Sequence, residues 1–295
     1  MRNSKFKGIG VALATPFDSK GEVDFDALGR IVDHVIEGGV DFLVALGTTA
    51  ETPTLSRAER AAVAKYIGER NAGRKPLVLG MGGNDTAGLC ADIKAFDTAG
   101  FDAILSVAPY YNKPTQEGLF RHYRAVAEAS PLPVILYNIP GRTGVNITAE
   151  TTLRIARQVP SVIGVKEASG DIDQMKAILA QAPEDFLVIS GDDAMVLPLV
   201  EAGGHGLISV LANALPAQTG RMVHAALDGD TASARAMEPD LAAIIPLLFA
   251  EGNPTGVKTA LDILGVCRPD MRLPLVEGSP ALRAEMTKYL APFLR

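Results

Sequence analysis

The sequence predicts a (β/α)8 TIM barrel followed by a C-terminal helical extension. Eight short apolar runs recur between residues 8 and 210, and amphipathic stretches with helical spacing separate them. The runs are apolar on both faces, as expected of parallel strands covered by helices. Their spacing is regular, and no G-x-G-x-x-G follows the first run, so a closed barrel is favoured over an open doubly wound sheet.

The elements can be placed in order along the chain. The predicted strands span residues 8–14, 41–46, 76–81, 101–108, 133–138, 162–167, 186–191 and 205–210. The stretch that starts at Ser56 is a predicted helix, because Ser56 and Glu59 form a capping-box pattern. A second helix is predicted at residues 86–96, where Leu89, Ile93 and Phe96 share one face.

No further strand is predicted after residue 211. The remaining chain contains four amphipathic stretches, which predict about four appended helices. We therefore expect residues 1–225 to form the catalytic barrel and residues 226–295 to form the C-terminal helical extension.

Composition limits the classes of partner. The net charge of −6 is spread without a Lys/Arg cluster, which argues against nucleic acid and anionic membranes and favours a small soluble partner. Cys90 and Cys267 are too few and too isolated for a disulfide framework or a cysteine-based zinc site, and we expect two buried thiols. The N-terminal apolar stretch is interpreted as the first strand of a cytoplasmic protein, and no run has the roughly 20 apolar residues of a membrane span.

Polar side chains follow several of the predicted strands. In a barrel of this class the active site lies at the carboxyl ends of the strands, so these side chains should meet at one rim. Each also has an ordinary structural explanation: a Gly-Thr-Thr turn can cap a helix, loop tyrosines can cover the barrel mouth, and a turn arginine can be solvated. The residues at this rim are Thr48, Thr49, Tyr110, Tyr111, Tyr137, Arg142 and Lys166.

Lys166 is the hardest of these to explain by structure alone. It lies near the end of the apolar strand "VIGVKE", and lysine is among the residues least often buried without a partner. A dry pocket disfavours the charged ammonium, so the free amine can attack a carbonyl and form a Schiff base, which acts as an electron sink. That chemistry needs a proton shuttle, for which tyrosine is suited, and donors for a substrate carboxylate, which a Gly-Thr-Thr turn supplies.

With these residues placed, the chain resembles the dihydrodipicolinate synthase family, within the pyruvate-dependent class I aldolases that include N-acetylneuraminate lyase. The resemblance runs essentially end to end and rests on several specific motifs in family order. They are "GIGVALATPFD", "GTTAE", "PYYNKPTQEGL", "ILYNIPGRTG", "GVKEASG", "SGDDA", "GGHGLISV" and "GNPTGVK". Two departures are Ala50, where glycine is usual, and Gly256, where proline is usual.

The resemblance implies a function and a role for each site residue. It implies condensation of pyruvate with L-aspartate 4-semialdehyde to 4-hydroxy-tetrahydrodipicolinate, the first committed step of the diaminopimelate route to lysine. No cofactor is implied beyond the pyruvate–lysine Schiff base, and a homotetramer built as a dimer of dimers is expected. The implied catalytic residues are Lys166, Tyr137, Thr48 and Tyr111, the last crossing a tight dimer interface, and the implied substrate-binding residues are Thr49, Arg142, Ile208 and Gly191.

Other functions stay open at the level of sequence. A planar guanidinium grips a carboxylate, whereas a polyhydroxy sugar acid needs hydroxyls and amides, so Arg142 favours the synthase over N-acetylneuraminate lyase. A keto-acid-binding barrel without turnover would be favoured if Lys166, Tyr137 or Thr48 were missing, and all three are present. The spacing in "GNPTGVKT" does not fit a nucleotide-binding P-loop.

We expect neither a metal nor lysine feedback. The four histidines lack metal-ligand spacing, and the carboxylates of "SGDDA" fit the start of a helix better than a metal site. Many relatives bind L-lysine at the dimer interface through an asparagine, a tyrosine, a glutamate and histidines. Here Asn84 and Tyr110 match, but Gly88 stands at the glutamate position and Arg57 and Arg60 at the histidine positions.

Overall fold

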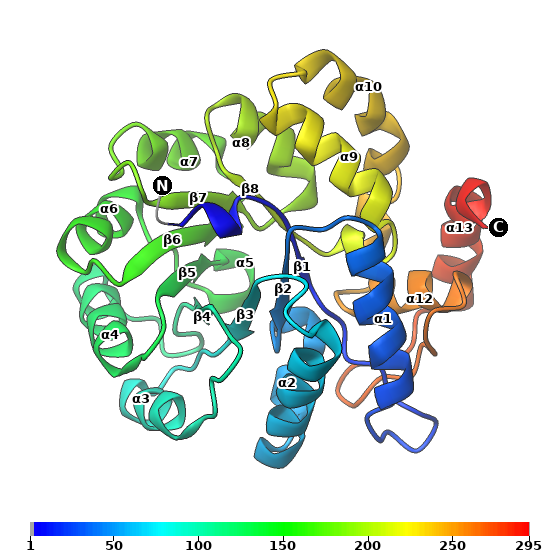
Figure 1. Ribbon diagram of the computed structural model, residues 1–295, viewed down its shortest axis with the longest axis horizontal. Coiled ribbons are helices and arrows are strands. Elements are labelled where there is room, and N and C mark those ends of the chain that lie inside the picture. Colours follow the sequence, from blue (N-terminus) through cyan, green and yellow to red (C-terminus); the bar gives the residue numbers. More distant parts are fainter. Residues whose placement is uncertain (1–2, 295) are drawn as a thin grey trace.

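The computed structural model describes residues 3–294, and its centre is a closed barrel of eight parallel strands (Figure 1). Each strand pairs with the next along the chain, and the eighth pairs with the first. The predicted fold class and all eight predicted strands are confirmed. The strands are β1 Gly8–Ala12, β2 Phe42–Ala45, β3 Leu77–Gly80, β4 Ala103–Val107, β5 Val134–Asn138, β6 Val162–Glu167, β7 Leu187–Ser190 and β8 Gly206–Ser209.

Helices surround the barrel and continue beyond it. Those between or directly after the strands are α1 Phe25–Glu37, α2 Arg57–Asn71, α3 Thr86–Ala95, α4 Gln116–Ala129, α5 Pro140–Thr143, α6 Ala149–Gln158, α7 Ile172–Leu179, α8 Val196–Glu201 and α9 Pro216–Leu227. The later ones are α10 Thr231–Ala242, α11 Ile245–Phe249, α12 Thr255–Ile263 and α13 Pro280–Leu290. Short 3-10 turns are η1 Ser4–Phe6, η2 Thr48–Ala50, η3 Thr52–Thr54, η4 Asp193–Met195, η5 Leu211–Asn213 and η6 Ala291–Phe293.

The predicted start of α2 is confirmed, and that of α3 holds in part. The Ser56 hydroxyl accepts from the Glu59 N–H at 3.2 Å, and the Glu59 carboxylate accepts from the Ser56 N–H at 2.8 Å, which completes the capping box. Leu89 and Ile93 are buried on one face of α3, as expected. Phe96 does not share that helical face, because α3 ends at Ala95 and Phe96 is in an extended conformation.

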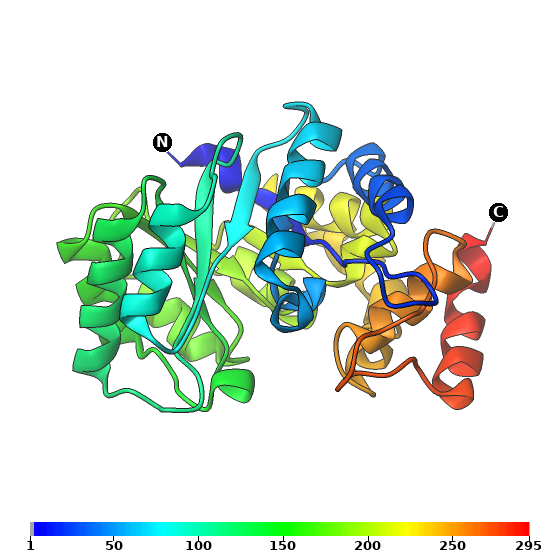
Figure 2. The ribbon, with the colours of Figure 1, turned by 90° about the horizontal axis from the view of Figure 1, so that it is seen from below.

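The C-terminal region contains one helix more than expected. Residues 231–252 are one of the four amphipathic stretches that each predict a helix, but this stretch divides into α10 and α11. Pro246 lies in the first turn of α11, where its missing N–H costs no hydrogen bond, so the chain starts a new helix there. α9 packs against β1 and α1, and residue 225 lies in its last turn. Figure 2 shows α11–α13, in orange and red, gathered at one side of the barrel.

The apolar core has two layers. Side chains inside the barrel form one cluster that includes Val44, Ile135, Tyr137 and Ile208, and the clusters between the strands and the surrounding helices are larger. Phe6 from η1 joins the inner cluster and packs edge-on against Phe42, with ring centroids 5.8 Å apart. The inner cluster fills the barrel, so ligands meet it at the strand ends.

The two cysteines are free thiols, but they differ in burial. Cys267 is buried, and burial raises the pKa of its thiol to about 12. Cys90 is only partly buried, so the prediction of two buried thiols is wrong for this residue, which lies on α3 with one side toward solvent. None of the helices within residues 3–294 combines the length and the apolar character that crossing a membrane requires.

Candidate active site

A β-bulge turns Lys166 into the barrel. β5 and β6 pair Val134 with Val162 but Ile135 with Gly164, so β6 holds one extra residue at this point. Val162 packs in the outer layer, whereas Ile163 belongs to the inner cluster. Because a one-residue slip moves every later side chain to the opposite face, Lys166 points inward. Strict alternation from Val162 would have pointed it outward.

Gly164 allows this bulge. A Cβ atom at this position would lie 2.7 Å from the carbonyl oxygen of Leu187 and 2.8 Å from its Cβ. Such contacts are closer than real Cβ atoms show, so only glycine fits against β7 here. The sequence "VIGVKE" therefore contains both Lys166 and the glycine that permits its inward orientation.

Lys166 and Tyr137 meet inside the barrel. They are register partners on β6 and β5, and the Lys166 Nζ lies 4.2 Å from the centroid of the Tyr137 ring. Lys166 is 4% exposed, and no carboxylate among residues 3–294 forms an ion pair with it. Lysine is seldom buried in this way without a partner, so Lys166 is a candidate for a reactive amine. The predicted juxtaposition of Lys166 with Tyr137 is thus present.

Gly191 makes room for the Lys166 side chain. A Cβ atom at Gly191 would lie 2.8 Å from the Lys166 Cε and 2.7 Å from the Ala168 Cβ. Gly191 also donates its N–H to the Glu167 carbonyl at 2.7 Å, which joins the ends of β6 and β7. Ile208 is fully buried in the same inner cluster as Tyr137. Both residues predicted to line the pocket therefore lie around the inner face that carries Lys166.

Glu167 fixes the end of β6 from the outer side. Its carboxylate is fully buried and accepts from the Asn138 Nδ2, the Gln174 Nε2 and the Ser169 N–H at distances of 2.7 to 3.1 Å. Three kinds of neutral donor thus satisfy the charge without a cation. Since neighbouring residues of a strand point to opposite faces, this network holds the backbone that carries Lys166.

Thr48 and Thr49 lie in the turn η2 that follows β2. Thr49 is 2% exposed, and its Oγ1 accepts from the Asn253 Nδ2 at 3.1 Å. Thr48 is partly exposed in the first position of the turn. Among the described residues no hydrogen bond joins Thr48 to Tyr137, so the predicted proton relay stays a prediction.

Arg142 lies in the short helix α5 after β5. Its side chain is largely exposed, and its Nη2 donates to the Asn253 carbonyl at 3.3 Å. Gly144 ends this helix with a φ of 74°, which favours glycine. Arg142 thus stands at the rim with most of its donors open to a ligand.

Sequence reasoning missed Asn253. Its side chain reaches Thr49 and its carbonyl reaches Arg142, so one residue of the extension connects two predicted substrate-binding residues. Asn253 is 7% exposed, and its Oδ1 has no hydrogen-bond partner among residues 3–294. A signal existed in the motif "GNPTGVK", which is one of the family motifs, but the motif alone gave Asn253 no role in the site.

Tyr111 does not join the site within this chain. It is 89% exposed, and no described residue forms a hydrogen bond with its phenol. Its φ is 72°, a left-handed conformation that costs a bulky residue on the order of 1–2 kcal/mol. The loop is held by other residues, with Asn84 donating to the Tyr110 carbonyl and Asn112 to the Asn84 carbonyl.

The carboxylates of "SGDDA" have two different partners. Asp192 caps η4 by accepting from the Ala194 N–H at 2.9 Å, as expected of a helix-start carboxylate. Asp193 does not do this: it accepts from the Ser209 hydroxyl and the Val210 N–H at the end of β8. Burial raises the pKa of the Asp193 carboxyl. Within residues 3–294 no group of three or more His, Cys, Asp or Glu is arranged to hold a metal ion.

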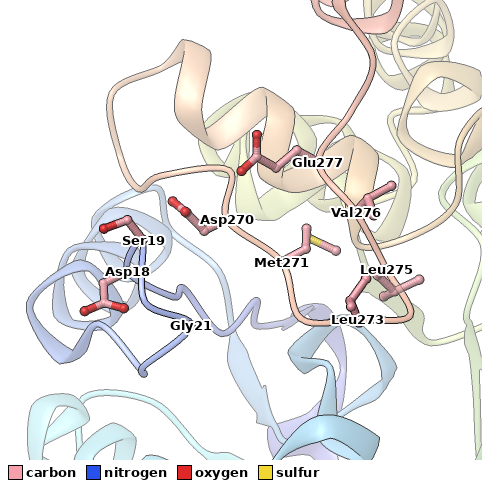
Figure 3. Close-up of a pocket in the computed structure, with 9 residues that line it drawn as sticks. All are labelled: Asp18, Ser19, Gly21, Asp270, Met271, Leu273, Leu275, Val276 and Glu277. Atoms are coloured by element: carbon pink, nitrogen blue, oxygen red, sulfur yellow. The ribbon is translucent and has the colours of Figure 1, made fainter.

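A surface groove lies away from these residues. It has a volume of about 380 Å³ and runs between the loop at Asp18–Gly21 and the loop at Asp270–Glu277 (Figure 3). Its lining combines carboxylates with apolar side chains and includes none of the predicted site residues. We assign the candidate active site to the strand ends because, within residues 3–294, a buried lysine, a tyrosine and a threonine turn come together at this rim.

Comparison with known proteins identifies the family of the chain. The model of the dihydrodipicolinate synthetase family matches residues 5–292. The chain belongs to this family. The predicted family is thus confirmed, over nearly the whole of the chain.

Individual members of the dihydrodipicolinate synthetase family are similar over nearly their full lengths. One from Parabacteroides distasonis, named 4-hydroxy-tetrahydrodipicolinate synthase, is 51% identical over 276 residues, or 94% of this chain and 93% of the relative. A structure described as a monomeric dihydrodipicolinate synthase variant has a TM-score of 0.96 at 38% identity and covers 99% and 98% of the two chains. The chloride-inhibited dihydrodipicolinate synthase from Acinetobacter baumannii, solved with pyruvate, has a TM-score of 0.93 at 40% identity and covers 97% and 98%.

Proposed function

We propose that this family member condenses pyruvate with L-aspartate 4-semialdehyde to form 4-hydroxy-tetrahydrodipicolinate. It is a lyase, and the reaction is the first committed step of the diaminopimelate route to lysine. The observation that carries the proposal is Lys166, a buried lysine without a carboxylate partner that lies against Tyr137 inside the barrel. The relative at 51% identity bears the name of this activity, and the Acinetobacter baumannii structure was solved with pyruvate.

Lys166 begins the reaction as a nucleophile. Its amine attacks the ketone carbon of pyruvate, and loss of water gives a protonated Schiff base. This electron sink acidifies the methyl group, whose proton leaves to give an enamine. The enamine carbon then attacks the aldehyde carbon of the second substrate, and the aldehyde oxygen takes up a proton. The amino group of that substrate attacks the re-formed Schiff-base carbon, which closes the ring and releases the Lys166 amine. No metal is needed at any of these steps, which accords with the predicted absence of a cofactor.

Proton transfer and the binding of the two substrate carboxylates are proposed for different side chains. Tyr137 lies beside Lys166 and is the first member of the proposed relay, which continues through Thr48 and Tyr111. The buried Thr49 and the N–H groups of its turn suit the carboxylate of pyruvate. Arg142 suits the carboxylate of the semialdehyde, because its guanidinium can donate two parallel hydrogen bonds.

The proposed relay implies a partner subunit. Tyr111 has an exposed phenol and a strained backbone, and within one chain neither feature serves a packing role. We propose that the chain forms a dimer, assembled further into a homotetramer, in which each Tyr111 enters the neighbouring site. Sedimentation equilibrium measures this state directly, and a monomer with full activity would contradict it.

The domain boundaries and the cellular location are also proposals. We retain residues 1–225 as the catalytic barrel and 226–295 as the helical extension, since α10–α13 follow the last barrel helix. A cytoplasmic location is proposed because both substrates are metabolites of central and amino-acid metabolism. Cell fractionation with an antibody against the chain tests the location.

Substrate comparison tests the function. Purified protein with pyruvate and L-aspartate 4-semialdehyde should form product at a rate that saturates in both substrates. N-acetylneuraminate should not be cleaved at a comparable rate, because the site presents the Arg142 guanidinium to a carboxylate. Cleavage of N-acetylneuraminate with no condensation would overturn the proposal in favour of the lyase. Pyruvate binding without turnover of either L-aspartate 4-semialdehyde or N-acetylneuraminate would favour a non-catalytic barrel.

A further inference from the structure

Two motif residues that the reaction does not use meet in the core. Glu51 ends the motif "GTTAE", and Lys258 ends "GNPTGVK". The side chains of both are completely buried, and the Lys258 Nζ donates to the Glu51 Oε1 at 2.5 Å. Buried lysine and glutamate side chains are rare, because removing their charges from water costs free energy. The position of this pair in the fold therefore indicates what it contributes.

Every polar atom of the pair has a partner. The Lys258 Nζ also donates to the Asp270 carbonyl at 2.9 Å and lies 4.2 Å from the centroid of the Phe17 ring. The second carboxylate oxygen of Glu51 accepts from the Arg272 N–H at 3.2 Å. Asp270 and Arg272 belong to the loop that walls the groove in Figure 3. The pair therefore joins α12, this loop and the segment that follows the turn η2.

Arg272 attaches the same loop to the barrel a second time. Its guanidinium pairs with Glu59 of α2 at 2.5 Å and donates to the Thr54 carbonyl at 2.9 Å. This guanidinium, together with the Ser56 N–H, lowers the pKa of Glu59 to about 2. The extension thus contacts the segment between η2 and α2 at both ends of that segment, at Glu51 and at Glu59.

Glu51 directly follows the turn that carries Thr48 and Thr49. Its φ is 52°, a left-handed conformation that costs a residue with a Cβ about 1–2 kcal/mol and persists only where the surroundings fix it. The Glu51 N–H donates to the Thr48 carbonyl, and the Glu51 carbonyl accepts from the Thr54 N–H. Anything that holds the Glu51 side chain therefore sets the orientation of the threonine turn.

We propose that Lys258 and Glu51 are positioning residues, through which the C-terminal extension holds Thr48 and Thr49 in place for the keto acid. The proposal rests on the function proposed above and deepens it. Asn253, five residues before Lys258, contacts Thr49 directly, so the same segment reaches the turn by two routes. The extension is accordingly a part of the active site.

A double variant separates positioning from stability. Removing one partner leaves a buried, unpaired charge and is expected to unfold the protein, whereas replacing both charges by neutral side chains of similar size is often tolerated. We therefore choose Glu51→Gln with Lys258→Met. The matched control is Asp262→Asn with Arg283→Met, which removes an ion pair between the same helix α12 and α13, away from the threonine turn.

The readouts are the melting temperature and the pyruvate concentration that gives half-maximal borohydride trapping. The double variant should stay folded and need about ten times more pyruvate, with a parallel rise in KM for pyruvate. The control should keep the pyruvate dependence of the wild type. A folded double variant with an unchanged pyruvate dependence would overturn the inference.

A second variant covers loss of folding. Lys258→Arg keeps the buried charge, but its longer planar head must displace Glu51, so a smaller rise in the required pyruvate is expected. An unchanged pyruvate dependence in this variant would equally overturn the inference. The outcomes distinguish the two proposals. If the wild type traps no pyruvate, the proposed function is wrong. If both variants trap pyruvate with the concentration dependence of the wild type, only the positioning role is contradicted.

Discussion

Gly191 faces the side chain of Lys166 closely enough to exclude any larger residue. We predict that Gly191→Ala slows pyruvate trapping at least tenfold, because the added Cβ would lie 2.8 Å from the Lys166 Cε and displace it. Overpacking of this kind costs about 1–3 kcal/mol, so the variant should remain folded. Trapping kinetics and thermal unfolding measure the two effects. The control is Gly68→Ala on α2, where a Cβ would meet nothing within 4 Å; equal trapping by both variants would contradict the prediction.

Arg142 should act on the second substrate alone. Arg142→Lys keeps a positive charge but loses the paired donors, so we expect use of the semialdehyde to weaken by roughly 1–3 kcal/mol, or about 5- to 150-fold in kcat/KM. Pyruvate trapping should persist. Steady-state kinetics with each substrate varied measure the split, and Arg121→Lys on the exposed face of α4 serves as control. An equal loss of trapping and condensation would mean that Arg142 is structural.

Individual site residues were predictable to different degrees. Lys166 and Tyr137 stand out in the sequence because each is the second-last residue of an apolar strand, and parallel strand ends share a rim. Asn253 was not predictable in this way, since its contact with Thr49 joins residues 204 positions apart. Tyr111 was placed at the rim because it follows the fourth strand, whereas its catalytic role came from the family resemblance, and the single chain leaves it exposed.

Among the elements, β6 shows what a periodicity pattern omits. The apolar run predicted the strand, but its bulge follows from the close approach of Gly164 to Leu187 on β7, a contact that no local pattern encodes. The same limit applied to residues 231–252, where helical periodicity continued through the break between α10 and α11. Gly256 departs from the usual proline because α12 starts against α11: a Cβ there would lie 2.4 Å from the Leu248 carbonyl oxygen.

The packing of α4 against α3 should depend on pH through His122. Burial lowers the pKa of this histidine to about 4; its Nδ1 pairs with the Thr86 hydroxyl at 2.9 Å and its Nε2 has no partner among the described residues. Between pH 6.5 and 4 the unfolded chain binds a proton that the folded chain does not. The free energy of unfolding is therefore expected to decrease as the pH is lowered from 6.5 to 4, by on the order of 2–3 kcal/mol.

Urea unfolding at a series of pH values measures this dependence. His122→Gln should flatten the slope between pH 6.5 and 4 while leaving condensation at pH 8 close to that of the wild type. The matched control is His34→Gln, the same substitution at a partly exposed histidine of α1. The same slope in all three proteins would assign the pH dependence to other groups.

At the scale of the whole molecule, the barrel and the extension form the rim together. Segments distant in the sequence meet there, through the hydrogen bond between Asn253 and Thr49 and the ion pair between Lys258 and Glu51. The sequence predicted the barrel and the presence of helices after it, because these depend on repeating local patterns. It did not predict that the extension reaches the threonine turn, because that depends on contacts between distant segments.

Regulation by the end product should be absent. Asn84 contacts the Tyr110 carbonyl, but Gly88 provides no carboxylate, and Arg57 pairs with Asp92 one turn further along α3 at 2.8 Å. An ammonium ion without an anionic partner loses hydration at a cost of several kcal/mol, and nearby arginines add repulsion. We expect millimolar L-lysine to leave the condensation rate nearly unchanged. Saturable inhibition at sub-millimolar lysine would show that other residues supply the charge.

The central claim is that Lys166 forms the Schiff base, and one measurement tests it most directly. The protein is incubated with pyruvate, reduced with borohydride and digested, and the modified peptide is identified by mass spectrometry. We predict a pyruvate adduct on Lys166 and none on Lys258, which is buried but paired with Glu51. Lys166→Ala should keep its fold and lose the adduct. An adduct on another lysine, or one that persists in Lys166→Ala, would contradict the account.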